Sequence, residues 1–197
     1  MRLIVAMTGA TGAPFGVRLL EVLRQVEDVE THLVLSRWAR PTIELETPYT
    51  AREVAKLADV VHGPGDQGAA ISSGSFRTGG MVIVPCSMKT LAGIRTGYAD
   101  GLIGRAADVC LKERRRLVLV TRETPLSEIH LDNMLALSRM GATILPPMPA
   151  FYTQPTSIAD VVDHLVARVL DQFDLPSPAV PRWQGLPEAR RGSAVTD

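Results

Sequence analysis

Three glycines, Gly9, Gly12 and Gly16, follow the apolar run from Leu3 to Met7 and precede residues with helical spacing. Small residues at a strand-to-helix turn let backbone N–H groups approach a phosphate, and the dipole of the following helix favours an anion there. The spacing Gly-x-x-Gly-x-x-x-Gly departs from the dinucleotide fingerprint Gly-x-Gly-x-x-Gly. It therefore predicts a site for a mononucleotide as readily as for a dinucleotide, or simply a tight turn with close helix–sheet packing.

The residues after the second apolar run, which ends at Leu35, bear on the choice of nucleotide. An enzyme that uses NAD normally places an acidic residue here to bind the ribose, whereas this chain has Ser36 and Arg37. These residues disfavour NAD and leave NADP open, because an arginine could accept its extra phosphate. Ser36 could also serve only as the N-cap of a helix.

Two further turns are rich in hydroxyl groups, from Ser72 to Ser75 and from Ser87 to Thr90. The second turn follows a strand-like run and opens a helix, so Ser87 and Thr90 could donate to ligand oxygens while Lys89 adds a positive charge. Alternatively, Ser87 caps the helix and Lys89 points into water. The density of small polar residues favours a ligand site.

Charged residues flank the strand-like run from Leu117 to Val120. Arg122 and Glu123 follow it directly and could combine an anion site with a proton-transfer group, although such a pair is more often a surface ion pair. Arg105 and Lys112 precede it, seven residues apart on one face of an expected helix. For these two residues a solvated basic helix end is the default interpretation.

A proline-rich segment after Leu145 leads to Tyr152, and Arg168 lies in the last expected helix. A phenol and a guanidinium suit a phosphate ester, with Phe151 and Met148 packing against its carbon part. On these residues alone, a core aromatic beside a solvated arginine is the preferred interpretation.

The chain organisation predicts a single α/β domain. Strands are expected at Leu3–Met7, His32–Leu35, Met81–Val84, Leu117–Val120 and Thr143–Leu145, and helices near Pro14–Val26, Ala51–Leu57, Gly101–Arg114, Ile129–Met140 and Ile158–Phe173. Runs that are apolar on both faces and alternate with helices indicate a parallel sheet covered on both sides, a three-layer fold of the Rossmann-like or flavodoxin-like kind. Ligands of such sheets bind outside the carboxyl ends of the strands.

Composition limits the function classes. The chain has 197 residues, 46% of them hydrophobic, and a formal net charge of zero, which argues against a nucleic-acid partner or a polybasic membrane surface. No targeting or membrane-spanning segment is recognised, so a cytoplasmic protein with a small-molecule ligand is expected. Cys86 and Cys110 are expected to be buried small hydrophobes without a metal. Residues 1–175 form the expected domain and residues 176–197 a partly mobile tail. Trp183 in this tail is expected to pack against another part of the protein.

Several long segments, in one order, resemble the UbiX-type flavin prenyltransferases from Met1 to about Asp171. They are Met7-Thr8-Gly9-Ala10, Ser73-Gly74-Ser75-Phe76, Pro85-Cys86-Ser87-Met88-Lys89-Thr90-Leu91-Ala92-Gly93-Ile94, Gly97-Tyr98-Ala99-Asp100, Arg105-Ala106-Ala107-Asp108-Val109, Leu111-Lys112-Glu113-Arg114-Arg115, Arg122-Glu123-Thr124-Pro125-Leu126 and Leu145-Pro146-Pro147-Met148-Pro149-Ala150-Phe151-Tyr152. Thr11 stands where the family usually has serine, which keeps the hydroxyl group. The resemblance identifies the chain as a member of this family.

The resemblance implies a metal-independent enzyme that joins the dimethylallyl group of dimethylallyl monophosphate to N5 and C6 of reduced FMN. It assigns FMN contacts to Gly9, Ala10, Thr11, Ser36, Ser87, Met88, Lys89, Thr90 and Arg122, and prenyl-phosphate contacts to Tyr152 and Arg168. It gives Glu123 the proton-handling role, Ser73 a hydroxyl near the reacting flavin, and Lys112 and Arg105 phosphate or acid–base roles. It also implies a homo-oligomer, commonly a dodecamer, with sites shared between subunits, and a UbiD-type decarboxylase that receives prenylated FMN.

Two other functions compete with this interpretation. An FMN-dependent decarboxylase of cysteine peptides or phosphopantothenoylcysteine has the same fold. Its sequence is similar to Pro-Ala-Ser-Ala-Asn-Thr at the place where this chain has Pro85 to Thr90. It also uses a histidine, and the segment around His62 does not resemble the segment that carries it. A non-catalytic FMN carrier would not need the second anion pocket formed by Lys112, Tyr152 and Arg168.

Overall fold

The structure is a computed structural model that describes residues 1–186. Its centre is a parallel sheet of six strands in the order β3-β2-β1-β4-β5-β6. The strands are β1 (Arg2–Met7), β2 (Glu30–Leu35), β3 (Val60–His62), β4 (Gly80–Cys86), β5 (Arg116–Thr121) and β6 (Thr143–Ile144). The predicted α/β fold with a parallel sheet is therefore confirmed. Residues 187–197 of the predicted tail lie outside the described residues.

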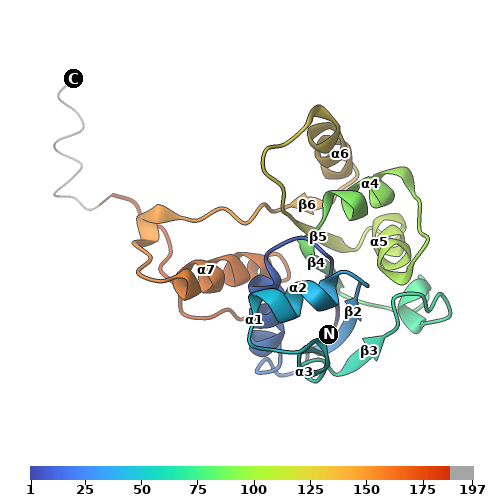
Figure 1. The fold of residues 1–197 in the computed structure, drawn as a ribbon, viewed down its shortest axis with the longest axis horizontal. Coiled ribbons are helices and arrows are strands. Elements are labelled where there is room, and N and C mark those ends of the chain that lie inside the picture. Colours follow the sequence, from blue (N-terminus) through green and yellow to red (C-terminus); the bar gives the residue numbers. More distant parts are fainter. Residues whose placement is uncertain (187–197) are drawn as a thin grey trace.

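Helices cover both faces of the sheet (Figure 1). They are α1 (Ala13–Leu23), α2 (Ala39–Glu46), α3 (Ala51–Ala55), α4 (Met88–Thr96), α5 (Leu102–Lys112), α6 (Glu128–Arg139) and α7 (Ile158–Asp171), with 3₁₀ turns η1 (Ala70–Ser72) and η2 (Phe151–Thr153). No helix within residues 1–186 has the length and apolarity that a membrane span requires.

Strand pleating explains why the core has two halves. In β1, Leu3, Val5 and Met7 face α1 and α7, whereas Ile4 and Ala6 face the layer of α4 and α5. Successive side chains of a strand point to opposite faces, so a strand covered on both sides needs apolar residues at every position. The continuous apolar runs of the sequence are thus the buried inner strands.

The five strands expected from the sequence are present, and the five expected helices are present with ends shifted by at most three residues. The structure adds α2, α4 and β3, which the sequence analysis did not delimit. β3 has only three residues, Val60 to His62, and they are half-buried or exposed, so it lacks the long apolar run on which strand prediction depends.

The sheet order places the topological switch point between β1 and β4, and the space outside the carboxyl ends of these strands is called the crevice below. From β1 the chain builds outward through β2 to β3, then returns to β4 and builds outward in the other direction through β5 to β6. The loops leaving β1 and β4 therefore diverge, and this switch point is where open parallel sheets bind ligands.

After β6 the chain leaves the body of the molecule as an extended arm, residues 145–150, before η2 and α7 bring it back (Figure 1). Met148, on this arm, and Phe151, just after it, are 72% and 76% exposed, so within one copy both apolar side chains are open to a partner. α7 returns to pack against α1 through Val162, Val166 and Val169.

Gly16 is required where α1 crosses the sheet. A Cβ atom at this position would lie 2.6 Å from the Val84 carbonyl oxygen and 2.7 Å from Met7 Cε. We expect Gly16→Ala to lower the free energy of unfolding by roughly 1–3 kcal/mol, because the helix must move away from the strand. Urea denaturation measures this change. Gly63→Ala is the matched control, since its Cβ would meet only Asp66 Cβ at 3.8 Å, and an equal loss in both variants would contradict the steric explanation.

Candidate functional site

The carboxyl edge of the sheet gathers all nine residues predicted to bind FMN, together with Glu123. Each follows the carboxyl end of a strand: Gly9, Ala10 and Thr11 after β1, Ser36 after β2, Ser87, Met88, Lys89 and Thr90 after β4, and Arg122 and Glu123 after β5. The structure therefore brings these ten residues to one side of the molecule. A cavity of about 350 Å³ lies here and includes Ser36, Lys89 and Thr90 in its walls.

The glycine turn after β1 differs in one respect from its predicted role. The N–H groups of Gly12 and Ala13, at the start of α1, both donate to Glu46 Oε2 at 2.8 Å. The anion at this helix start is thus a carboxylate of the chain itself, as the helix dipole favours. Glu46 was missed because α2, which carries it, was not predicted.

The remaining N–H groups of this turn are open. Within the described residues, the backbone N–H groups of Gly9, Ala10 and Thr11 have no protein acceptor. Gly9 also has no room for a side chain, since its Cβ would lie 2.4 Å from Trp38 Cβ. A ligand oxygen can approach this backbone without displacing a hydrogen bond.

The two serines at the crevice, Ser36 and Ser87, cap helices and are also candidate ligands for FMN. Ser87 Oγ accepts a hydrogen bond from Thr90 N–H at 3.4 Å, and Ser36 Oγ accepts one from Ala39 N–H at 3.1 Å. Capping fixes each side chain and leaves lone pairs or the hydroxyl proton for a ligand. Lys89 is exposed beside them and adds a cation at the start of α4.

Arg122 and Glu123 extend from the end of β5 beside β4. The Arg122 N–H donates to Cys86 O at 3.2 Å, which holds the loop against β4. Glu123 Oε1 accepts a hydrogen bond from Thr124 N–H at 3.1 Å. In the described part of the chain the two side chains form no ion pair with each other, so the surface-pair interpretation is wrong for this geometry.

Three other predicted residues lie on the α5 side of the sheet: Arg105 and Lys112 belong to α5, and Ser73 belongs to a loop that contacts this helix. Arg105 Nε donates to Ser72 O at 3.0 Å, and a Cβ at Gly74 would lie 2.7 Å from Lys112 Nζ. Arg115 clamps the same loop, with Nη1 donating to Phe76 O at 2.8 Å. The loop that carries Ser73 therefore lies along α5.

Lys112, at the end of α5, and the crevice lie at opposite edges of the sheet. Lys112 ends α5 and precedes the amino end of β5, whereas Glu123 follows its carboxyl end. A six-residue strand is about 20 Å long, so one copy of the chain does not bring Lys112 and Glu123 together. Lys112 pairs instead with Glu113, and this contact lowers the pKa of the Glu113 carboxyl.

Tyr152 and Arg168 form a third group at the far end of the arm. Both line a cavity of about 440 Å³ with Arg182 and Trp183. Tyr152 packs edge-on against Trp183, with ring centroids 5.4 Å apart, so the tail aromatic does cover something. Asp171 binds both guanidinium groups, from Arg168 at 2.7 Å and from Arg182 at 2.8 and 2.9 Å.

The cavity is cationic because two guanidinium groups face one carboxylate. Arg182 was missed by the sequence analysis, although Trp183 beside it was noted as an aromatic in a polar tail. In Figure 1, α7, which carries Arg168, lies on the side of the molecule away from α4 and α5. No described residue that lines this cavity also lines the cavity of Ser36, Lys89 and Thr90.

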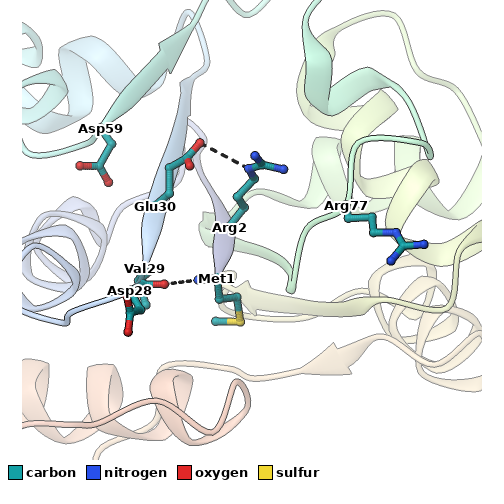
Figure 2. Close-up of a pocket in the computed structure, with 7 residues that line it drawn as sticks. All are labelled: Met1, Arg2, Asp28, Val29, Glu30, Asp59 and Arg77. Carbon is teal, nitrogen blue, oxygen red and sulfur yellow. Dashed lines mark hydrogen bonds and ion pairs between the residues drawn. The ribbon is translucent and has the colours of Figure 1, made fainter.

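A shallow hollow of about 650 Å³ lies at the amino edge of the sheet (Figure 2). Figure 2 shows Glu30 and Asp59 on one side and Arg2 and Arg77 on the other, with an Arg2–Glu30 ion pair of 3.5 Å. None of the predicted site residues lines this hollow. Its opposite charges largely offset one another, so it offers no anion site.

The cysteines play no part in the site. Cys86 and Cys110 are free and fully buried, and burial raises the pKa of each thiol to about 12. Their expected role as small hydrophobes is confirmed. Residues 1–186 contain no group of three or more His, Cys, Asp or Glu side chains that could hold a metal ion.

Comparison with known proteins defines the class. Residues 1–170 match the Flavoprotein family. The chain is 75% identical over 190 residues to a probable UbiX-like flavin prenyltransferase of a Streptomyces species, covering 96% of this chain and 95% of the relative. The chain belongs to the flavoprotein family and, within it, to the UbiX-like flavin prenyltransferases.

Two solved structures share the fold closely. A dodecameric FMN-dependent UbiX-like decarboxylase from Escherichia coli O157:H7 is 70% identical, with a TM-score of 0.93 over 94% of this chain and 100% of that chain. AnUbiX in complex with FMN and dimethylallyl pyrophosphate is 59% identical, with a TM-score of 0.92 over 94% of this chain and 98% of that chain. By contrast, the FMN-dependent cysteine decarboxylase TvaF is 13% identical with a TM-score of 0.65, which shows a common fold alone.

The contact between Arg182 and Asp171 predicts a pH-dependent attachment of the segment that carries Trp183. The hydrogen bonds from Arg182, followed in importance by the charges of Arg182 and Arg168, lower the pKa of Asp171. A carboxyl whose pKa is lowered on folding stabilises the structure above its unfolded pKa and loses this effect as the pH falls through its folded pKa. We therefore expect acid to release Trp183 once Asp171 is protonated.

Acrylamide quenching of tryptophan fluorescence measures this release. The chain has two tryptophans, so the Trp38→Phe background reports Trp183 alone. We expect Arg182→Gln in this background to show high quenching at neutral pH, whereas the parent shows it only below the ordinary carboxyl pKa of about 3.9. Identical quenching in both proteins at neutral pH would contradict a role for the contact.

Proposed function

We propose that the protein transfers the dimethylallyl group of dimethylallyl monophosphate to N5 and C6 of reduced FMN. The observation that carries this proposal is a set of residues at the carboxyl edge of the sheet, in a chain so similar to named flavin prenyltransferases: Gly9 to Thr11, Ser36, Ser87 to Thr90, Arg122 and Glu123. AnUbiX, at 59% identity, supports the substrate class, since it was solved with FMN and dimethylallyl pyrophosphate.

The crevice residues fit FMN rather than NADP or FAD. One phosphate and one polar ring edge can be bound by the donors present here. These are the free N–H groups of Gly9 to Thr11 and the helix-capping hydroxyls of Ser36 and Ser87, and Lys89 adds a cation. Because Glu46 occupies the start of α1, the flavin phosphate is assigned to the start of α4. A mononucleotide needs only one such site.

The proposed reaction breaks the bond between the allylic carbon and the phosphate oxygen, and the phosphate leaves with the electron pair. Cations must stabilise the departing phosphate while N5 of reduced FMN bonds to the allylic carbon and releases its proton. The second bond consumes the remaining double bond: an acid protonates one of its carbons and C6 bonds to the other. A base must then accept the C6 proton. Glu123 is the proposed base, and Tyr152, Arg168, Lys112 and Arg105 are the proposed phosphate ligands, with Ser73 near the reacting ring.

These groups can act together only if copies of the chain share their sites. In one copy, the crevice, the Ser73 loop and the Tyr152 pocket are separate, and the arm that leads to Tyr152 carries exposed Phe151 and Met148. We infer that each site combines the crevice of one copy with the α5 end and the arm of others. The dodecameric state of the relative from Escherichia coli supports a homododecamer.

The product, prenylated FMN, needs an acceptor. A UbiD-type decarboxylase is the proposed recipient, and the cytoplasm is the proposed location. Neither follows from the geometry of the crevice, so both stay predictions of the family resemblance.

The test is an anaerobic incubation of the purified protein with reduced FMN and dimethylallyl monophosphate. We expect the flavin to gain the mass of one five-carbon prenyl unit, because both bonds form on the flavin ring, and inorganic phosphate to appear in equal amount. Flavin mass spectrometry and a phosphate assay measure these changes. An unchanged flavin mass, or tight NADP binding without FMN, would overturn the proposal.

Shared sites predict complementation between two damaged variants. Glu123→Gln removes the proposed base and should slow turnover by about 10²–10⁴-fold. Arg168→Ala removes a charged hydrogen bond worth roughly 1.5–3 kcal/mol and should weaken binding of the prenyl phosphate, with partial recovery in Arg168→Lys. Each variant alone should bind FMN almost normally.

Co-expression of the two variants in one oligomer decides whether the sites are shared. Some sites then combine an intact Glu123 from one copy with an intact Arg168 from another, so activity should exceed that of either variant alone. The control mixes the two purified variants under conditions where the oligomers do not exchange subunits. If co-expressed oligomers are no more active than this mixture, each site lies within one copy.

A further inference from the structure

We infer that Thr8, to which no role has been assigned above, is a positioning residue for the FMN site; this inference rests on the proposed function. Thr8 follows the last residue of β1 and is 3% exposed. Its hydroxyl donates a hydrogen bond to Pro85 O at 2.8 Å and accepts one from Ser87 N–H at 2.9 Å. It thus joins the two loops that diverge at the switch point.

The sequence around Pro85 explains why a side chain is needed here. The regular pairing of β1 with β4 ends at Ala6 and Ile83, and Pro85 has no N–H group with which to continue the ladder. The Thr8 N–H also donates to Pro85 O, at 3.2 Å, so the hydroxyl adds a second bond to that carbonyl and a new one to Ser87. The two strand ends stay joined beyond the point where backbone pairing stops.

Ser87 transmits this contact to the ligand groups of α4. The Ser87 side chain caps α4 by accepting from Thr90 N–H, and its hydroxyl lies 3.1 Å from Thr90 Oγ1. On the Thr8 side, the next residue is Gly9, the first residue of the open glycine turn. Thr8 therefore fixes the distance between the two groups of donors that are proposed to bind one FMN molecule, without touching the ligand itself.

Thr8→Val is the decisive variant because valine has nearly the same shape and no hydroxyl. Pro85 O keeps its bond from the Thr8 backbone N–H, whereas the Ser87 N–H loses its acceptor. We expect the dissociation constant for FMN to rise about ten-fold, the change that matches one lost hydrogen bond at the strong end of the usual range. Thr8→Ser, which keeps the hydroxyl, should stay within about two-fold of the parent.

Thr31→Val is the matched control. Thr31 is 1% exposed in β2, and its hydroxyl likewise donates one hydrogen bond, to Asp59 Oδ2 at 2.8 Å, and accepts one, from Asp59 N–H at 3.0 Å. It lies near the amino end of its strand, away from the crevice. We expect Thr31→Val to lower the unfolding temperature about as much as Thr8→Val and to leave the FMN dissociation constant unchanged.

The experiment measures FMN binding by quenching of flavin fluorescence and amide hydrogen exchange by mass spectrometry on the full-length protein. Faster exchange at Ser87 to Leu91 and weaker FMN binding, both confined to Thr8→Val, support the inference. Unchanged FMN binding in Thr8→Val, or equal weakening in Thr31→Val, overturns it. If the parent itself binds no FMN, the proposed function fails, and unchanged exchange at Ser87 in Thr8→Val would then overturn the positioning role separately.

Discussion

The parallel direction of all six strands is the constraint on which the rest of this structure depends. It places every strand's carboxyl end at one edge, so residues that follow strands meet there however far apart they lie in the sequence. It also places the carboxyl ends of the crossover helices at the other edge. For this reason Lys112 and Glu123, only eleven positions apart, are separated by the length of β5. Within one copy, the residues predicted for the site are therefore divided between the two edges.

The sequence predicted those features that depend on local pattern. Continuous apolar runs marked the buried strands, and hydroxyl residues after them marked the crevice, because a residue's place just after a strand fixes the edge on which it lies. Glu46 escaped prediction, since its contact with Gly12 and Ala13 spans more than thirty residues and arises from a helix with a weak pattern. Arg182 escaped because its partner Asp171 lies on another element.

Family resemblance and local chemistry contributed different things. Tyr152 and Arg168 looked like a core aromatic and a solvated arginine from their own surroundings, and the resemblance alone placed them in one site. The structure shows them lining one cavity with Arg182. This cavity and the crevice are not in contact within one copy. Local sequence patterns do not show how the two are related in space.

The outermost strands have a consequence for how copies can associate. β3 has three residues and β6 has two, so each lateral edge of the sheet offers few free backbone hydrogen-bonding groups. Long open edges invite further strands and lead to unlimited growth of a sheet between molecules. Such short edges favour association through helices, loops and the arm instead of through further strands. Association by such surfaces closes into a particle of fixed size when the angles permit, instead of growing without limit.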